Sequence, residues 1–289
     1  MAKKSTEVAV RSSAAVAVPD FLKGYKGPLG TENIETADVT IPRLKIGQAI
    51  TDEVKDGNVA EGSLFLNVTG QAVWSPGDKP LPLTIVARNK EYILWRPRKD
   101  GGGVLARARP VRDQKTGVTR YKWDRPNQEF KVKVEGKIAV TWKTKEYIDQ
   151  DGLDQWGSEI PGDKESGIAA TAHHNYVMVL PAVDNVVAAL SLSRSGVKKA
   201  KDLNATLKMD TRAPLHGKVF TIVTVDETSA DGDKYKNVSI KPAGYVTDER
   251  SFEAFSSIAK GFVETDFSVD HSDNDGDDDA APKGKGGKF

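Results

Sequence analysis

Residues 83–109 read LTIVARNKEYILWRPRKDGGGVLARAR, and this stretch decides the fold that we expect for the chain. Apolar, β-branched and aromatic residues recur in the runs 83–88, 91–98 and 104–109, and such residues favour strands. The glycines of KDGGG separate the last two runs, and glycine adopts the positive φ that tight hairpin turns need. The stretch therefore predicts a β-hairpin within a series of antiparallel strands.

Similar strand-type runs occur on both sides of this hairpin, each bounded by turn residues. They cover residues 64–70, 129–134, 137–142, 175–181, 186–193, 218–225 and 235–242. Two segments instead repeat apolar residues at helical spacing, one over 195–209 and one after Thr247. The sequence predicts a mainly β fold of the α+β class with two short amphipathic helices.

Composition divides the chain into three parts. Residues 1–37 show little periodicity and are expected to form a mostly disordered N-terminal arm, whereas residues 38–265 are expected to fold as a single domain. From residue 266 the chain reads DFSVDHSDNDGDDD, with seven aspartates, and then AAPKGKGGKF. Residues 266–289 are therefore predicted to be a disordered tail, acidic first and then rich in Lys and Gly.

Several classes of chemistry find no residues to support them. The chain has no cysteine, which excludes disulfides and Cys-based zinc sites and suits a reducing compartment. It has no HExxH, GxSxG or GxxxxGK[ST] motif, so we expect no enzyme, no cofactor and no metal. No window approaches the roughly 18 apolar residues that cross a bilayer, so we expect no membrane association.

Positive charge gathers around the predicted hairpin. Residues 88–125 hold twelve Lys or Arg and four acids, an excess of 12 − 4 = +8, although the whole chain carries a net charge of only +1. Adjacent like charges repel unless a polyanion offsets them, and guanidinium groups bind phosphate while aromatic rings stack on unpaired bases. The candidate contacts with nucleic acid are Arg96, Arg98, Lys99, Arg107, Arg109, Arg112, Lys122, Tyr92, Trp95 and Trp123.

Strand geometry gives these residues an expected arrangement. Because side chains alternate along a strand, four guanidinium groups of the hairpin are expected to converge on one surface, those of Arg96, Arg98, Arg107 and Arg109. The alternative is a solvated hairpin whose tryptophan side chains pack in the core.

The acidic tail has two interpretations. It can simply keep the protein in solution, or it can compete with nucleic acid for the basic surface as a tethered polyanion. In the second case, a bound strand displaces the tail, which is then free to contact other proteins. The residues concerned are Asp273, Asp275, Asp277, Asp278, Asp279 and Phe289.

Four segments resemble bacteriophage single-stranded DNA-binding proteins: IPRLKIGQA (41–49), YILWRPRKDGGGVLARA (92–108), LSLSRSGVKKAKDLN (190–204) and KNVSIKPAGYVTDE (236–249). The resemblance implies an OB-like antiparallel barrel with additional strands, in which bases stack on aromatic side chains. It also implies that the terminal aromatic residue and its acidic neighbours recruit phage replication proteins. The chain departs from the family pattern at its end, where KGKGGKF places lysines between the aspartates and Phe289.

These observations together predict a non-enzymatic protein that coats single-stranded DNA during phage replication or recombination, with little sequence preference. We expect it in the cytoplasm of the infected bacterial host, where it can form homo-oligomers. One alternative is a structural or assembly protein of the virion. A second is a metal-dependent nuclease built on Asp124, Glu129 and Lys131.

Overall fold

The computed structural model describes residues 41–114, 116–229 and 232–264, which belong to one compact unit that begins at Ile41. The N-terminal arm predicted for residues 1–37 and the acidic tail predicted for residues 266–289 lie outside the described residues.

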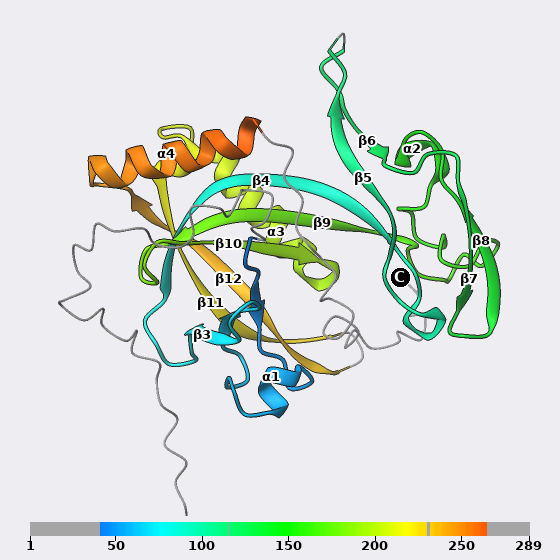
Figure 1. Ribbon diagram of the computed structural model, residues 1–289, viewed down its shortest axis with the longest axis horizontal. Helices are drawn as coiled ribbons and strands as arrows, with labels where there is room; N and C mark the ends of the chain where they lie inside the picture. The colour runs from blue at the N-terminus through cyan, green and yellow to red at the C-terminus, as the bar shows by residue number, and fades with distance from the viewer. Residues whose placement is uncertain (1–40, 115, 230–231, 265–289) are drawn as a thin grey trace, which may run out of the picture. The chain divides into compact units, whose positions relative to one another are not determined.

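Antiparallel strands dominate the fold (Figure 1). The main sheet has the order β10-β9-β4-β11-β12, with β5 paired to β4 and β6 paired to β5. Its strands are β4 (Leu81–Trp95), β5 (Val104–Arg112), β6 (Thr119–Trp123), β9 (Ala170–Leu180), β10 (Val186–Ser193), β11 (Lys218–Thr228) and β12 (Lys234–Tyr245). No pairing among the described strands closes this sheet into a barrel, so the structure departs from the OB-like barrel that we expected.

Two smaller sheets and several helices complete the described fold. One sheet contains β1 (Leu44–Ile46), β2 (Leu64–Leu66) and β3 (Gln71–Trp74), and the other contains β7 (Glu129–Val134) and β8 (Ile138–Lys143). The α-helices are α1 (Asp52–Lys55), α2 (Ile148–Asp151), α3 (Val197–Met209) and α4 (Glu249–Glu264). Short 3-10 turns occupy η2 (Arg98–Asp100), η3 (Arg194–Gly196) and η4 (Leu215–Gly217).

The mainly β, α+β prediction is confirmed, with one change in how the strands divide. The predicted run 83–88 and the first part of the run 91–98 belong to one long strand, β4, because the polar residues between them also pair with β9. The strand ends at Trp95, earlier than predicted, and Arg98 begins η2. The strand-type runs 218–225 and 235–242 lie in β11 and β12, which pair as an antiparallel hairpin, and the two amphipathic helices form as predicted.

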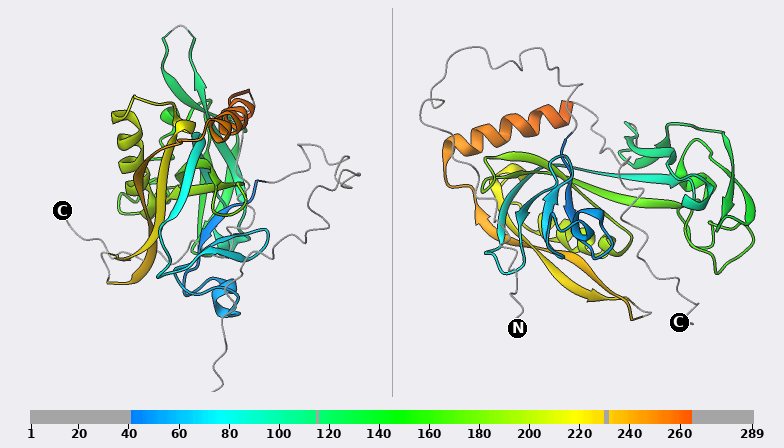
Figure 2. Two further views of the ribbon diagram at one scale, coloured as in Figure 1. Left: turned by 90° about the vertical axis from the view of Figure 1, so that its left-hand side faces the viewer. Right: turned by 60° about the horizontal axis from the view of Figure 1, so that its bottom comes forward.

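Helices cover both faces of the main sheet (Figure 2, left). On one face, Leu83, Met178 and Phe220 pack with Leu203 of α3 and with the small β1–β2–β3 sheet, and these residues belong to the first core. On the opposite face, Val177 packs with α4. A second core surrounds Leu94 and joins β4 and β5 to β7, β8 and α2.

A β-bulge in β4 determines which side chains face α3. The register with β9 shifts between Ile85 and Ala87, so Val86 is an extra residue. An inserted residue reverses the alternation of every side chain that follows it. Arg88 and Lys90 therefore continue the face that Ile85 begins, the face on which the first core lies.

Candidate nucleic-acid interface

A row of cationic and polar side chains separates the two cores on this face of the sheet. Along β4 the face runs from Ile85 of the first core through Arg88 and Lys90 to Tyr92, which packs against the second core. His174 of β9 lies opposite Lys90. Lys201 comes from α3, the helix that packs on the same face. We call Arg88, Lys90, His174 and Lys201 the cationic interval.

Two tyrosines hold the ammonium group of Lys90 at one end of this interval. Its Nζ donates a hydrogen bond of 2.6 Å to Oη of Tyr92 and lies 4.4 Å from the centroid of that ring. The same Nζ lies 5.1 Å from the ring centroid of Tyr121 in β6. The two rings meet edge to face at 4.9 Å. These contacts orient the charge without neutralising it, because an aromatic ring and a hydroxyl carry no net charge.

Neutral partners also hold the other end of the interval. Nη1 of Arg88 donates to Oδ1 of Asn204 on α3, at 3.5 Å. The same oxygen accepts a hydrogen bond of 3.1 Å from Tyr176 of β9. Within the described residues, no ion pair with a carboxylate involves Arg88, Lys90 or Lys201. Three cations therefore share one face without an ion-pair partner among the described residues. Burial and, to a lesser extent, the carboxylate of Asp154 raise the pKa of the adjacent Tyr92, so one acid lies near this face.

The pKa of His174 reflects this excess of positive charge. Burial lowers the pKa of its imidazole, and Lys90, Lys201 and Arg88 lower it further, from 6.5 to about 4. His174 is consequently neutral at physiological pH. A bound anion would relieve the repulsion, because it offers opposite charge to the same three side chains.

The structure does not bring the four hairpin arginines onto one surface, which corrects that expectation. Arg107 lies opposite Ile93 in the β4–β5 pair, so it and Arg109 occupy the face away from Tyr92. On the face away from Tyr92, Nη1 of Arg107 lies 3.7 Å from Oε2 of Glu91. On the same face, the ring of Trp95 lies 6.0 Å from that of His173. The physical reason is the pairing register, which places Ala108, and not an arginine, opposite Tyr92.

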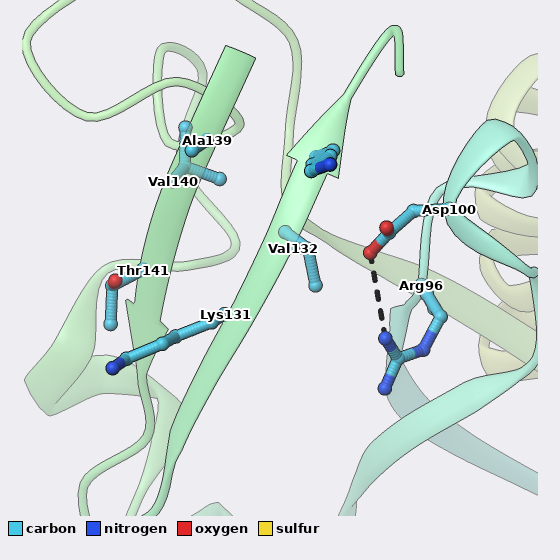
Figure 3. A pocket seen from close by; sticks show the side chains of 8 residues that line it. Arg96, Asp100, Lys131, Val132, Ala139, Val140 and Thr141 are labelled. Atoms are coloured by element: carbon cyan, nitrogen blue, oxygen red, sulfur yellow. Dashed lines mark hydrogen bonds and ion pairs between the residues drawn. The ribbon is translucent and has the colours of Figure 1, made fainter. Parts of the chain in front are cut away.

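Other predicted contacts are spread over separate parts of the chain. Arg96 pairs with Asp100 at 3.4 Å, and Arg98 and Lys99 lie in the exposed turn η2. Figure 3 shows Arg96 and Asp100 on one side of β7, with Lys131 directed away from them. Arg112 is exposed at the end of β5, and Lys122 pairs with Glu146 at 3.3 Å. Of the ten predicted contacts, the cationic interval adjoins only Tyr92.

Trp123 is a core residue, which corrects its predicted role in base stacking. Its side chain is 2% exposed and belongs to the second core. The indole N–H donates a hydrogen bond of 2.6 Å to Asp151. Burial raises the pKa of Asp151, whose carboxylate also accepts the backbone N–H groups of Lys145 and Leu153. No ring face is open to a nucleobase.

Residues suggested for nuclease chemistry take part in structural contacts. Asp124 accepts the backbone N–H of Arg107 at 2.9 Å, and Glu129 pairs with Lys143 at 3.1 Å. In the described ranges, no three His, Asp or Glu side chains come close enough to hold a metal ion together. None of the helices described there combines the length and apolar character needed to cross a bilayer.

The interval contains residues that sequence reasoning did not select. Arg88 and Lys90 belong to the basic stretch, but nothing in the sequence distinguishes them from the other cations there. Lys201 lies more than a hundred residues away, on the polar side of a predicted helix. The sequence feature that points to this interval is the pair Tyr92 and Tyr121, two aromatic residues interleaved with the cations of residues 88–125.

The fold and this surface define a mainly β, α+β protein with a cationic face between two hydrophobic cores, and in the described residues no carboxylate forms an ion pair with its three cations. The chain matches the family described as Pam3 phage gp34-like protein over residues 10–267. Because the match covers most of the sequence, the chain belongs to this phage protein family. Searches of the curated proteins and of the solved structures gave no match.

Proposed function

We propose that this protein binds single-stranded DNA with little sequence preference and coats it during phage replication or recombination, in the cytoplasm of the infected host. The observation that carries the proposal is the positive charge of Arg88, Lys90 and Lys201, three cations without an ion-pair partner in the described residues, beside the tyrosine pair. Phosphates would bind the three cations. Membership of a phage family supports a role in the phage cycle.

The chemistry of the site favours a single strand over a duplex. A flexible strand exposes its bases, so a base next to a bound phosphate can contact the half-buried rings of Tyr92 and Tyr121. Stacking of one base on an aromatic ring contributes about 1–3 kcal/mol and depends little on sequence. A duplex keeps its bases paired and offers the site phosphates alone.

A mobility-shift assay separates this function from the two alternatives. Labelled single and double strands are titrated with the protein across a salt series, with and without Mg²⁺. A single-strand binder shows tighter binding to single strands and affinity that falls steeply with salt. A virion structural protein would show little salt-sensitive affinity, and a nuclease would degrade DNA once Mg²⁺ is added. Equal binding to both substrates, insensitive to salt, would exclude our proposal.

Titration of His174 tests whether phosphate occupies the interval. In the free protein its pKa is lowered to about 4 by burial and by Lys90, Lys201 and Arg88. Bound phosphate stabilises the imidazolium form, so we expect oligonucleotide binding to raise the pKa of His174. Proton uptake then strengthens binding as pH falls toward the pKa of the complex. The measurement is NMR titration of the histidine ring protons.

His216 is the matched control for that titration. Its pKa is lowered by burial and by Lys260, away from the interval. Its titration should therefore not change when DNA binds. An unchanged pKa of His174 in a saturated complex would place the DNA elsewhere.

Removal of the residues after Asp266 is expected to strengthen DNA binding several-fold at low salt. The reason is that a tethered polyanion has a high effective concentration near the cationic surface. The difference should vanish near 1 M salt, where the Debye length is about 3 Å. Fluorescence anisotropy with a labelled oligonucleotide measures both effects. A full-length variant with Asp273, Asp275 and Asp277–Asp279 changed to asparagine should behave like the truncated protein if charge is the cause.

A further inference from the structure

The loop of residues 153–168 presents two apolar side chains to solvent, and we call it the Trp156 loop. It follows α2, which lies against β6 (Figure 1). Trp156 is 70% exposed, although tryptophan is highly buried in most folded proteins, and Ile168 is 43% exposed. An exposed indole offers a large apolar area with a polar N–H, the combination enriched at protein interfaces. The loop is therefore a candidate contact surface.

Internal hydrogen bonds hold the Trp156 loop in one conformation. The N–H of Gly157 bonds to the carbonyl groups of Ser166 and Gly167, at 2.9 and 3.1 Å. The loop is also tied to β8, because the indole N–H of Trp142 donates to the carbonyl of Glu159 at 3.0 Å. The two exposed apolar side chains thus stand on a preorganised support, which lowers the entropy cost of a contact.

Charge on the Trp156 loop favours a cationic partner. The loop contains four acids and one lysine, a net charge of 1 − 4 = −3. Among the described residues, none of these four carboxylates forms an ion pair. Asp163 and Glu165 are exposed, and the carbonyl of Asp163 would lie 3.3 Å from a Cβ atom on Gly157. These carboxylates would repel a DNA phosphate, so a nucleobase is a poor partner for Trp156.

The chain itself contains a segment with the chemistry that the loop favours. Residues 283–289 read KGKGGKF, with three lysines, one phenylalanine and no acid, and they lie outside the described residues. An ammonium group beside an indole gains cation–π attraction, and a phenylalanine ring packs favourably against it. This segment therefore matches both the negative charge and the exposed indole of the loop.

The connection to the folded unit is long enough for this contact. Helix α4 ends at Glu264, so Lys283 follows it by 283 − 264 = 19 residues. That length of chain spans up to about 60 Å when it is extended. A folded unit of about 220 residues has a radius of gyration of only about 17 Å. Attachment to the same chain also gives the segment a high effective concentration near the loop.

The order of charges along the tail complements the order of charges on the surface. The Trp156 loop begins beside the cationic interval, because the N–H of Ala170 donates to the carbonyl of Leu153 and Ala170 pairs with Leu94, two residues from Tyr92. The surface is thus cationic first and acidic next to it. After α4 the chain is instead acidic first, in residues 266–279, and then basic. Each part of the tail can therefore face the opposite charge.

We propose that residues 283–289 dock on the Trp156 loop of the same chain, with the lysines against Asp163 and Glu165 and Phe289 against the indole. Docking fixes the second end of the tail and so holds its aspartates near the cationic interval. It also gives a role to the lysines by which this chain departs from the expected tail pattern. The inference does not depend on the proposed function, because the contact forms in the protein without DNA.

The first test measures proximity in the full-length protein by NMR. Because the chain has no cysteine, Gly286→Cys provides a single site for a nitroxide spin label. The label is expected to remove most of the intensity of the Trp156 indole N–H signal, and reduction of the nitroxide should restore it. Trp156→Phe identifies that signal among those of the five tryptophans. A Trp156 signal of unchanged intensity would overturn the proposal.

A mixed sample shows whether the contact lies within one chain. Spin-labelled protein without the NMR isotope is mixed with isotope-enriched protein without the spin label. The Trp156 signal should keep its intensity in this mixture, because only contact between two copies could reduce it. An intensity loss as large as in the single-chain experiment would show that the segment docks on another copy, contrary to our proposal.

A charge exchange supplies the second test. Asp163→Lys with Glu165→Lys should abolish the loss of intensity, because the loop then repels the lysines of the tail. The further changes Lys283→Glu, Lys285→Glu and Lys288→Glu should bring the loss back, because the two charges are again opposite. Misfolding cannot produce this rescue. A combined variant that is folded by circular dichroism but keeps its full Trp156 signal would contradict the pairing.

The matched control reverses the same charge elsewhere. Asp52→Lys with Asp56→Lys changes two exposed acids, one in α1 and one at its C-cap. This control variant should show the same loss of Trp156 intensity as the spin-labelled protein without these changes. If it abolishes the loss as completely as the loop variant does, net charge and not the Trp156 loop attracts the tail, and the proposal is wrong.

Discussion

Simultaneous replacement of Arg88, Lys90 and Lys201 by alanine is expected to weaken binding to a single-stranded oligonucleotide by about a thousandfold at low salt. Each cation removed costs about 1.4 kcal/mol, a factor of ten, if each contacts one phosphate. The salt dependence should also fall, because each lost phosphate contact lowers the slope of log K against log[salt] by about 0.7 for single strands. Three contacts together reduce the slope by about 2. Anisotropy titrations across a salt series measure both quantities.

The control for this variant removes the same charge elsewhere. The control variant removes three exposed cations on β12 and α4 by the changes Lys241→Ala, Arg250→Ala and Lys260→Ala. Helix α4 packs on the sheet face opposite α3. This control triple variant should lose only the long-range electrostatic attraction between protein and DNA. The slope of its log K against log[salt] should stay close to that of the unchanged protein. If the two triple variants weaken binding equally, net charge alone drives association and the cationic interval has no special role.

Replacement of Trp123 by alanine is expected to lower the free energy of unfolding by about 3–5 kcal/mol. The indole is 2% exposed in the second core, so alanine leaves a cavity there. The change also removes the 2.6 Å hydrogen bond to Asp151, whose carboxylate holds the start of the loop after α2. Urea unfolding followed by circular dichroism measures this loss.

Two further variants show whether the buried volume of Trp123 or its hydrogen bond to Asp151 contributes more to stability. Trp123→Phe retains most of the apolar volume and loses the hydrogen bond, so it should cost less than Trp123→Ala. Trp95→Ala affects a half-buried side chain outside the second core and should cost about 1 kcal/mol. A stable Trp123→Ala protein with weakened DNA binding would restore the stacking role that we assigned to Trp123 from the sequence.

Local pattern predicted the secondary structure well, because strands and helices follow from short-range preferences. The run EFKVKV alternates apolar and charged residues and forms β7 with the predicted bounds, Glu129–Val134. Phe252, Phe255, Ile258 and Phe262 recur at helical spacing and lie in α4. The concentration of positive charge in residues 88–125 is likewise a property of the sequence alone.

The composition of the candidate site depended on tertiary structure. Simple alternation along residues 83–95 would place Arg88 and Lys90 on the face opposite Ile85. The bulge at Val86 reverses that order, and valine is an ordinary strand residue that gives no sign of a bulge.

Sequence by itself therefore determined the fold class, the strand and helix positions, and the presence of a basic hairpin in this phage family member. Tertiary structure alone decided that Lys201 and Tyr121 join Lys90, that Arg107 lies on the other face, and that Trp123 is buried. The physical reason is that alternation and propensity act over a few residues. Register, bulges and helix docking instead depend on pairing between segments that are distant in the chain.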